Sequence, residues 1–437
     1  MYLQEISLIL LQVIFIYLFF NNTIISSKIL GKIESIKNFT NIDFIIINII
    51  IFLNLLILIS IFSINSMYFF YLYVLLILLT LSKDFIKKIK INFSYKNIII
   101  LFLVFILSLD LAYTLELGWD TQWFWYLKAL NFYQDQNFSN LKNLPIKAYP
   151  HLGPYIWGFF WKFPFGNFEY LGRIVYIFFY TLAIFSFSEI LKINNHLKYI
   201  FSLIIIIATY KYDLFNGDSD ILMFIFLLFA AKFTYYLYQS KKNQLLLILV
   251  LLGIANILIW IKYEAAFFIL FLISSIFVCN KIINKKNKIV MITSFFFLIL
   301  FKVSMLWVLD MPMIDDKSFG LQETMYFNFD EFYYRITNIL FFIFVFLVQS
   351  PIYLLTLPLM IISIRLLKAN PLNITILLFT FIFFSFTIFA YFFKVDQIVF
   401  QLRFSMGEFL FSASGIYLLV FANFLNTYLL KGKKTYN

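Results

Sequence analysis

Long apolar runs, separated by short polar or charged stretches, dominate the chain from end to end. A run of about 20 apolar residues is long enough for a helix to cross the hydrocarbon core of a bilayer. Thirteen such runs stand out, and Tyr or Trp often lies near their ends, as is typical of membrane interfaces. They cover residues 3–20, 42–62, 66–82, 96–112, 169–191, 199–215, 221–238, 244–260, 265–279, 289–308, 337–364, 371–393 and 404–430. The pattern predicts an all-α, polytopic bundle of about 13 transmembrane helices.

One more apolar stretch, Tyr149–Phe165, does not fit this series. Counting it as a crossing would invert every later loop and place the lysines of 281–288 outside, against the positive-inside rule. Its prolines and glycine also make it a poor spanning helix. We therefore expect an amphipathic helix that lies on the outer membrane interface, within an interfacial loop.

Composition agrees with a membrane protein and excludes a soluble one. Hydrophobic residues make up 63% of the chain and charged residues 13%, with a mean hydropathy of +0.91. An average soluble protein is roughly 45–50% apolar and about 25% charged. Thirteen crossings leave no room for a globular catalytic domain outside the membrane, and the single cysteine, Cys279, excludes a disulfide framework.

The positions of the basic residues explain the net charge of +12 and predict sidedness. No Lys or Arg precedes the first apolar run, and three lysines follow it, which places the N-terminus outside. The predicted cytoplasmic segments then hold 21 of the 34 Lys and Arg but only four of the 22 Asp and Glu. The basic residues therefore act as topological anchors, the basic tail 431–437 is cytoplasmic, and nucleic-acid binding is disfavoured.

Two outer segments, 113–168 and 309–336, are long enough to carry a site, and the first contains the most informative stretch, Glu116–Ala129. There Asp120 follows a predicted helix among several tryptophans, including Trp119. Partial desolvation by such rings would raise the pKa of the carboxyl toward values useful for a general base. The structural alternative is a helix cap within an aromatic belt. No G-x-x-x-x-G-K-[ST] motif is present, so an ATP-driven pump is excluded.

A second outer stretch, Tyr210–Asp220, carries three carboxylates, Asp213, Asp218 and Asp220, at a predicted membrane boundary. Such a group could bind a divalent cation or an acceptor hydroxyl. The structural alternative is a solvated turn in which Asp218 or Asp220 caps the next helix.

Charged residues mark two further places on the same predicted face. Lys262 and Glu264 lie where two helices meet, as a functional or a purely structural ion pair. Arg403 lies at the outer start of the last helix, where a guanidinium needs an anion such as a lipid phosphate. Snorkelling to ordinary head groups is the alternative for Arg403.

Taken in order, these stretches resemble the GT-C superfamily of integral-membrane glycosyltransferases, in the branch of protein O-mannosyltransferases and lipid A aminoarabinose transferases. The features that carry the resemblance are Asp120 after the first core helix, Tyr149–Pro154 as a variant of a Pro-rich interfacial helix, the acidic turn Asn216–Asp220, the L-x-x-K-x-E-like Leu258–Glu264, and Arg403. The chain departs from the family in having Thr121 where many members carry a second acid. The resemblance covers about 96–430, including both outer loops, so 1–95 would be an N-terminal three-helix addition.

The resemblance implies transfer of a sugar from a polyprenyl-phosphate donor to a lipid, glycan or protein acceptor, at the outer face of a bacterial inner membrane. Asp120 would be catalytic, and Arg403 with Lys262 would bind the donor phosphate. The remaining acids, Asp218, Asp220 and Glu264, would bind the acceptor or a metal, and the need for Mg or Mn is left open. The implied partners are donor, acceptor and membrane lipids.

Two other functions compete with this interpretation. A lipid-linked oligosaccharide flippase or other secondary transporter would place charges within helices along a path through the bilayer, whereas here few are deep, notably Lys302 and Glu189. An outer-face polysaccharide polymerase or ligase often carries its main external loop late in the chain, whereas the longest loop here follows the fourth predicted helix.

Overall fold

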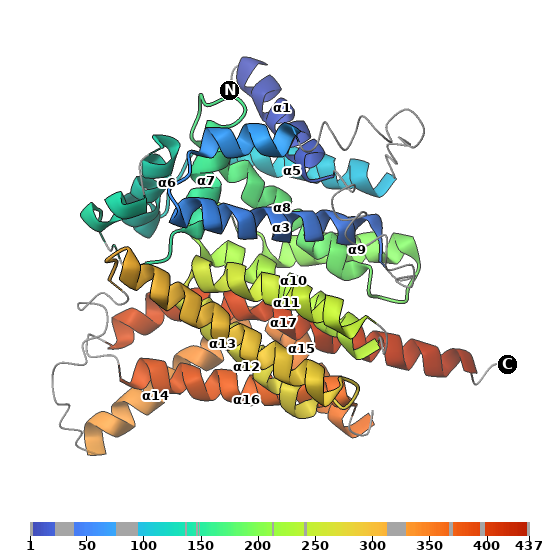
Figure 1. Cartoon of the computed structure of the whole chain (residues 1–437). Helices are drawn as coiled ribbons and strands as arrows, with labels where there is room; N and C mark the ends of the chain where they lie inside the picture. Colours follow the sequence, from blue (N-terminus) through green and yellow to red (C-terminus); the bar gives the residue numbers. More distant parts are fainter. Residues whose placement is uncertain are drawn as a thin grey trace. The chain divides into compact units, whose positions relative to one another are not determined.

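The computed structural model describes residues 3–21, 39–75, 95–135, 138–145, 147, 149–211, 214–239, 243–312, 329–366, 370–393 and 398–434. Within these residues every regular element is a helix and none is a strand (Figure 1). Ten of the described helices are long and apolar enough to cross a membrane. The chain is therefore an all-α, multi-pass membrane protein, as the apolar runs predict.

The ten long helices are α1 (Leu3–Phe20), α3 (Asn41–Ile61), α5 (Tyr95–Thr114), α8 (Tyr170–Ser188), α10 (Asp220–Gln239), α11 (Gln244–Ile261), α13 (Lys285–Val308), α14 (Phe329–Gln349), α16 (Pro371–Phe392) and α17 (Ile398–Lys434). Shorter apolar helices are α9 (Asn195–Thr209), α12 (Tyr263–Cys279), α15 (Pro351–Leu366) and a helix over Ser66–Leu75. Between α5 and α8 lie the π-helical turn η1 (Thr121–Trp125), α6 (Tyr126–Tyr133), the 3-10 turn η2 (Phe138–Asn143) and α7 (Leu152–Lys162).

The structure differs from the sequence-based helix series at 337–364, where the hydropathy pattern predicts one crossing. Two helices, α14 and α15, meet there at Ser350 and Pro351. Proline has no backbone N–H and fits the first turn of a helix, so Pro351 ends one helix and begins the next. The predicted run 66–82 is helical to Leu75, and its remainder lies outside the described residues. The exact number of crossings, and the sidedness derived from it, stay predictions.

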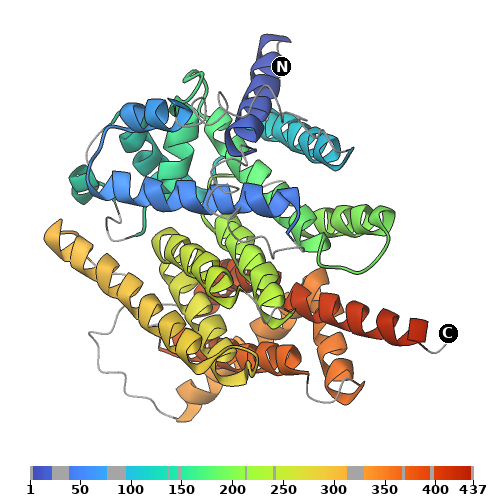
Figure 2. The same ribbon diagram turned by 45° about the vertical axis from the view of Figure 1, so that its right-hand side comes forward.

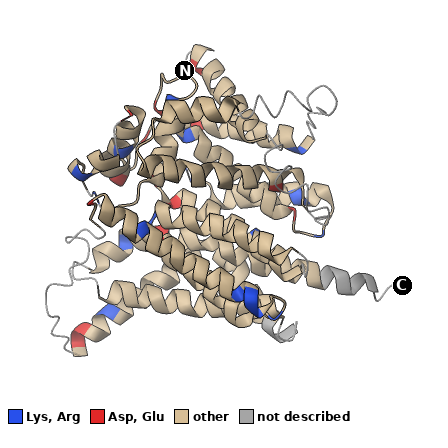
Figure 3. Ribbon diagram, in the orientation of Figure 1, with Lys and Arg blue, Asp and Glu red and all other residues tan. Residues whose placement is uncertain are grey.

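The described charges agree with membrane-spanning helices. Figure 3 shows long stretches without charge, while Lys, Arg, Asp and Glu gather mostly near helix ends and in connecting segments. Part of the predicted anchoring charge and most of the second outer loop lie outside the described residues, namely Lys28, Lys32, Lys37, Lys83, Lys87, Lys88, Lys90, Lys241, Lys242, Lys368 and 313–328.

The chain divides into two compact units, of which the first comprises Met1–Ser186, Tyr210–Leu222 and Val308–Met311. Within it α1 packs against α5 and α3, α3 contacts α7, and α6 packs against α7. Figure 2 shows the α1–α5 pair from a second direction. The described helices of 1–95 thus belong to the same unit as α5, α6, α7 and most of α8. Their status as an addition to a family core stays a prediction.

Helix α7, in the apolar stretch that the sequence pattern excludes from the crossings, is a packed element of this first unit. Its 11 residues extend about 16 Å, roughly half the thickness of the hydrocarbon core. All residues from Leu152 to Trp161 are buried. The helix therefore lacks the solvated polar face expected of an amphipathic surface helix, because α6 and α3 pack against it.

The second unit comprises Phe187–Thr209, Met223–Trp307 and Pro312–Asn437. Helix α17 is its central element and packs against α14, α15 and α16, while α12 packs against α11 and α16. Aromatic rings fill this interior, as where Phe268, Phe383 and Phe409 contact one another with centroids 4.8–5.5 Å apart. This packing fixes the helix ends that carry the charged candidates of the unit.

Candidate functional site

The first unit brings together two of the acidic stretches that the sequence predicts to be functional. Thr121, next to Asp120, donates a hydrogen bond from Oγ1 to Oδ1 of Asp218 at 2.5 Å. The backbone N–H of Gly118 donates to the carbonyl oxygen of Asn216 at 3.2 Å. The segment that leaves α5 and the turn that enters α10 therefore lie against each other, although 97 residues separate Thr121 from Asp218.

Two glycines permit this close approach. A Cβ on Gly118 would lie 2.5 Å from Nδ2 of Asn216 and 2.9 Å from Oδ2 of Asp218. Gly217 has φ +101°, in the left-handed region that favours glycine, and a Cβ there would lie 2.5 Å from Cγ2 of Thr121. Neither position has room for a larger residue.

We expect Gly217→Ala to destabilise the first unit by about 1–3 kcal/mol, because it combines backbone strain with a clash against Thr121. Gly166→Ala is the matched control. Gly166 also has a positive φ (+66°), but its nearest Cβ contact would be an ordinary 3.4 Å, so only the backbone strain applies. Thermal unfolding of both variants in detergent measures the two losses of stability. Equal losses would show that the loops are not in close contact at Gly217.

Arg173, in α8, is bonded to both loops. Its side chain is fully buried. Nε donates to Oε1 of Glu169 at 2.8 Å and Nη2 donates to Oε2 at 3.1 Å. Nη1 donates to the carbonyl oxygens of Glu116 and Phe215, both at 2.9 Å. A single guanidinium thus fixes one carbonyl in each loop, which aligns the Asp120 segment with the Asp218 turn.

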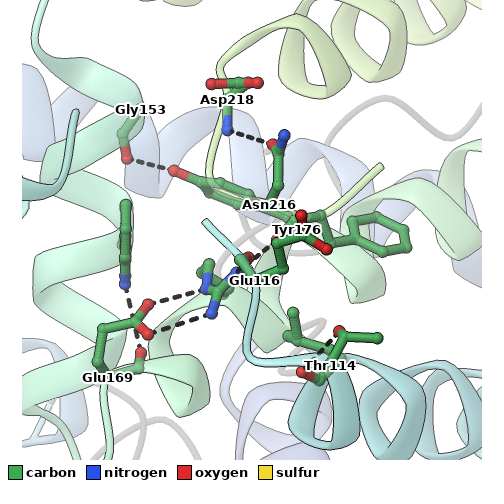
Figure 4. Close-up of polar contacts among 11 residues, drawn as sticks. Thr114, Glu116, Gly153, Glu169, Tyr176, Asn216 and Asp218 are labelled. Atoms are coloured by element: carbon green, nitrogen blue, oxygen red, sulfur yellow. Dashed lines mark hydrogen bonds and ion pairs between the residues drawn. The ribbon is translucent and has the colours of Figure 1, made fainter. Parts of the chain in front are cut away.

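Helix α7 supports the same arrangement from the other side. Trp157 donates from Nε1 to the carbonyl oxygen of Glu169 at 3.3 Å, and its ring lies 5.7 Å from the guanidinium carbon of Arg173. Tyr176 donates to the carbonyl oxygen of Gly153 at 2.7 Å (Figure 4).

Neither Arg173 nor Glu169 stands out in the sequence. Both lie in the predicted crossing 169–191, where one Arg near a helix end resembles an anchoring residue. The feature of the sequence that indicates this ion pair is the i, i+4 spacing of Glu169 and Arg173, which places opposite charges on one helical face.

Asp120 itself is exposed at the start of η1. The desolvation by tryptophans that the sequence predicts is not seen at this exposed residue. Trp125 is buried, whereas Trp119 and Trp123 are 70% and 56% exposed. The carboxylate is therefore accessible to a ligand. Asp220 begins α10 and is half-buried, and Asp213 lies outside the described residues.

Lys128, seven residues along the chain from Thr121, is a fully buried lysine in α6. It donates from Nζ to the carbonyl oxygen of Tyr149 at 2.8 Å and lies 5.5 Å from the ring centroid of Trp125. Burial lowers the pKa of Lys128 to about 7. A lysine in this state loses its charge near neutral pH, so it is not an anchor for a membrane surface.

The remaining predicted residues lie in the second unit. Lys262 is the extended residue between α11 and α12, and Glu264 is in the first turn of α12. Both interact electrostatically with the hydroxyl of Tyr391 in α16, as does Glu408 of α17. Tyr391 and Glu408 therefore join the predicted group, although the sequence pattern does not single them out.

Lys302 of α13 also reaches the junction of α11 and α12. It donates from Nζ to the carbonyl oxygen of Ile259 at 2.7 Å, and its Nζ lies 5.4 and 4.8 Å from the ring centroids of Trp260 and Tyr263. The charge of Glu264 acts on it as well. The sequence marks Lys302 as a deep charge, and the structure gives it a structural role at this helix junction.

Arg403 lies on an exposed face of α17, between buried Leu402 and the half-buried Ser405. Ser405 and the hydroxyl of Tyr391 are hydrogen-bonded at 2.8 Å. The candidate residues thus form two groups, one in each unit: Asp120, Asp218 and Asp220 in the first, and Lys262, Glu264 and Arg403 in the second.

Among the described residues, no group of three or more His, Cys, Asp or Glu is arranged to hold a metal ion. The chain matches no family model, no curated protein and no solved structure.

Proposed function

We propose that this protein transfers a sugar from a polyprenyl-phosphate donor to a hydroxyl or amine of a lipid, glycan or protein acceptor. The observation that carries the proposal is the contact between the Asp120 segment and the Asp218 turn. These two acidic stretches are the ones whose order resembles the GT-C glycosyltransferases, and Arg173 holds both. Asp120 is exposed, and its neighbour Thr121 is bonded to the carboxylate of Asp218, so both acids lie on segments that contact each other.

In the proposed reaction Asp120 removes the proton from the acceptor while the acceptor oxygen or nitrogen attacks the anomeric carbon. The bond from that carbon to the phosphate oxygen breaks, and its electron pair leaves with the polyprenyl phosphate, so the anomeric configuration inverts. Asp218, whose Oδ1 accepts from Thr121, is fixed in place and orients the acceptor together with Asp220. A bound Mg or Mn ion would be held by these two acids.

The departing phosphate gains negative charge and needs a cation. Arg403 is permanently charged, and its planar fork can donate two hydrogen bonds to one phosphate. Its exposure on α17 leaves it accessible to the head of a lipid donor. Lys262 would assist, and Glu264 would bind the acceptor or a metal ion.

We expect Arg403→Ala to lower turnover strongly, by about 10²-fold or more, because the contact strengthens as charge develops on the leaving phosphate. Arg403→Lys keeps the charge but loses the fork, so it should retain part of the activity. Purified variants assayed with a synthetic polyprenyl-phosphate sugar give both values. Lys142→Ala, which removes a half-exposed cation that the reaction does not use, is the control. Normal specific activity in Arg403→Ala would reduce Arg403 to a membrane anchor.

Glycan analysis and lipid mass spectrometry of a deletion strain test the function whichever sugar is transferred. Accumulation of one glycosyl-phosphoryl-polyprenol would name the donor. Reconstitution into liposomes then separates the proposal from its rival. A transferase releases polyprenyl phosphate, whereas a flippase or other transporter moves a lipid-linked sugar between leaflets and leaves its phosphate linkage intact.

A further inference from the structure

A cavity of about 170 Å³ lies in the first unit, where α3 and α6 end. One wall is the turn between α3 and the helix Ser66–Leu75, and the other walls come from α6, η2 and α7. The lining residues are Ile59, Ser60, Ser63, Ile64, Asn65, Ser66, Phe132, Asp135, Phe138 and Tyr155. Its size is comparable to the roughly 150 Å³ cavities that admit a six-membered ring.

Asp135 provides the main polar group of this cavity. Its Oδ1 accepts a hydrogen bond from Oγ of Ser66 at 2.7 Å, and its Oδ2 is ion-paired with Lys162. Each carboxylate oxygen can accept a second hydrogen bond. Because the negative charge of Asp135 is balanced by Lys162, the cavity favours a neutral ligand that can donate hydrogen bonds.

Further polar and aromatic groups surround the carboxylate. Oγ of Ser60 and Nε2 of His151 are hydrogen-bonded at 2.9 Å, and both residues are buried. The rings of Phe132 and Tyr155 pack together with centroids 4.3 Å apart. The cavity therefore combines hydroxyls and a carboxylate with apolar ring surface, which is the combination that a sugar needs for its hydroxyls and its C–H groups.

The backbone gives an independent indication that the side chains matter here. Ser63 follows α3 with φ +51°, and Asp135 follows α6 with φ +54°. This left-handed position after a helix usually carries glycine; Asp adopts it comparatively readily, whereas a serine pays about 1–2 kcal/mol there. Both residues line the same cavity, and Ser63 is the strained one. Strain of this kind is typical of ligand sites, where the side chain is needed despite its cost.

We propose that the cavity binds one ring of a neutral sugar. Asp135 accepts hydrogen bonds from adjacent hydroxyls of the ring, Ser63 and Asn65 complete the polar contacts, and Phe132 with Tyr155 packs against the C–H groups. The assignment of this ring to the acceptor rests on the proposed transferase function, whereas the binding itself does not. The acceptor would then be a saccharide or glycolipid.

Binding of methyl glycosides to the full-length protein tests this site. The protein is purified in lauryldimethylamine oxide, because detergents with sugar head groups would compete. Saturation-transfer NMR with the methyl glycosides of glucose, galactose, mannose and N-acetylglucosamine should detect at least one ligand. We expect Asp135→Asn to lower the affinity for that ligand at least tenfold. Asn keeps the shape of the side chain and tolerates the positive φ.

Asp310→Asn is the matched control. Asp310 is also an aspartate with positive φ (51°), and it is also ion-paired with a lysine, Lys142, but its side chain is 93% exposed outside the cavity. Its replacement should leave glycoside binding unchanged. Ser63→Gly relieves backbone strain, so the melting temperature should stay the same or rise, while the affinity for the glycoside should fall.

Two results would overturn the proposal: no glycoside binding to the wild-type protein, or equal affinity in Asp135→Asn and Asp310→Asn. Weakening by Ser63→Gly without loss of stability excludes a general folding defect. Transfer from the polyprenyl-phosphate donor is measured separately. If the protein binds a glycoside but does not transfer sugar, the transferase proposal is refuted and the sugar site is retained. If it transfers sugar but binds no glycoside, the sugar site is refuted and the transferase proposal is retained.

Discussion

Replacing Asp120 by Asn should reduce sugar transfer by roughly 10²–10⁴-fold, because Asn keeps the shape and hydrogen bonding of the side chain but cannot accept the acceptor's proton. Asp120 is exposed, so the folded fraction of the Asn variant, measured by thermal unfolding, should stay high enough for the assay. The contact between Thr121 and Asp218 does not involve its side chain and should persist. Turnover of purified protein, normalised to folded protein, measures the effect.

Glu116→Gln is the control for Asp120→Asn. Glu116 is a second exposed acid in the same segment, and it contributes its backbone carbonyl, not its carboxylate, to the bond with Arg173. The Glu116→Gln variant should therefore have near-normal turnover. If Asp120→Asn were as active as the wild type, the base would be Asp218 or Asp220, and Asp218→Asn would be the next variant.

Replacing Arg173 by Met should destabilise the first unit by about 3–5 kcal/mol, because it breaks the ion pair of a buried guanidinium and leaves the partly buried carboxylate of Glu169 without this partner. Two backbone carbonyls, of Glu116 and Phe215, would lose their donor as well. Arg173→Lys keeps the charge but cannot make all four hydrogen bonds, so its loss should be intermediate. Thermal unfolding in detergent and transfer activity should fall together.

Two comparisons test the reason for this loss. The double variant Arg173→Met with Glu169→Leu also removes the carboxylate that Arg173→Met leaves without its ion pair, so it should be more stable than Arg173→Met alone. Arg335→Met in the second unit removes a similar i, i+4 pair. There the side chain of Glu331 is 39% exposed, against 20% for Glu169, so the carboxylate left behind is better solvated. A loss at Arg335 as large as at Arg173 would contradict the proposed clamp.

The helices are largely predictable because the apolar runs that lipid requires are long and continuous. The run 3–20 coincides with α1, and 244–260 with α11 to within a residue. The run 337–364 is wrongly predicted as one helix, because hydropathy does not depend on whether a residue has a backbone N–H. Pro351 lacks this N–H and divides the run into two helices. Helix α7 is recognisable as too broken to span, but its complete burial depends on tertiary neighbours that a local pattern does not reveal.

The candidate site is predictable only as separate pieces. Asp120 and Asp218 stand out because carboxylates are rare in so apolar a chain, and the structure places their segments in contact. Arg173 escapes notice because its function lies in bonds to distant carbonyls, which leave no pattern in the sequence. The cavity beside Asp135 escapes notice for a related reason, since its lining comes from five short segments between residues 59 and 155.

The clamp formed by Arg173 reaches the two loops through main-chain oxygens alone, those of Glu116 and Phe215. Any amino acid supplies such an oxygen. The ring of Phe215 is buried against Tyr180, but the side chain of Glu116 is exposed, so it can be exchanged without removing the bonds that align the loops. A residue that selects a substrate could then vary at position 116 while the alignment persists, which makes this position a suitable starting point for engineering altered specificity.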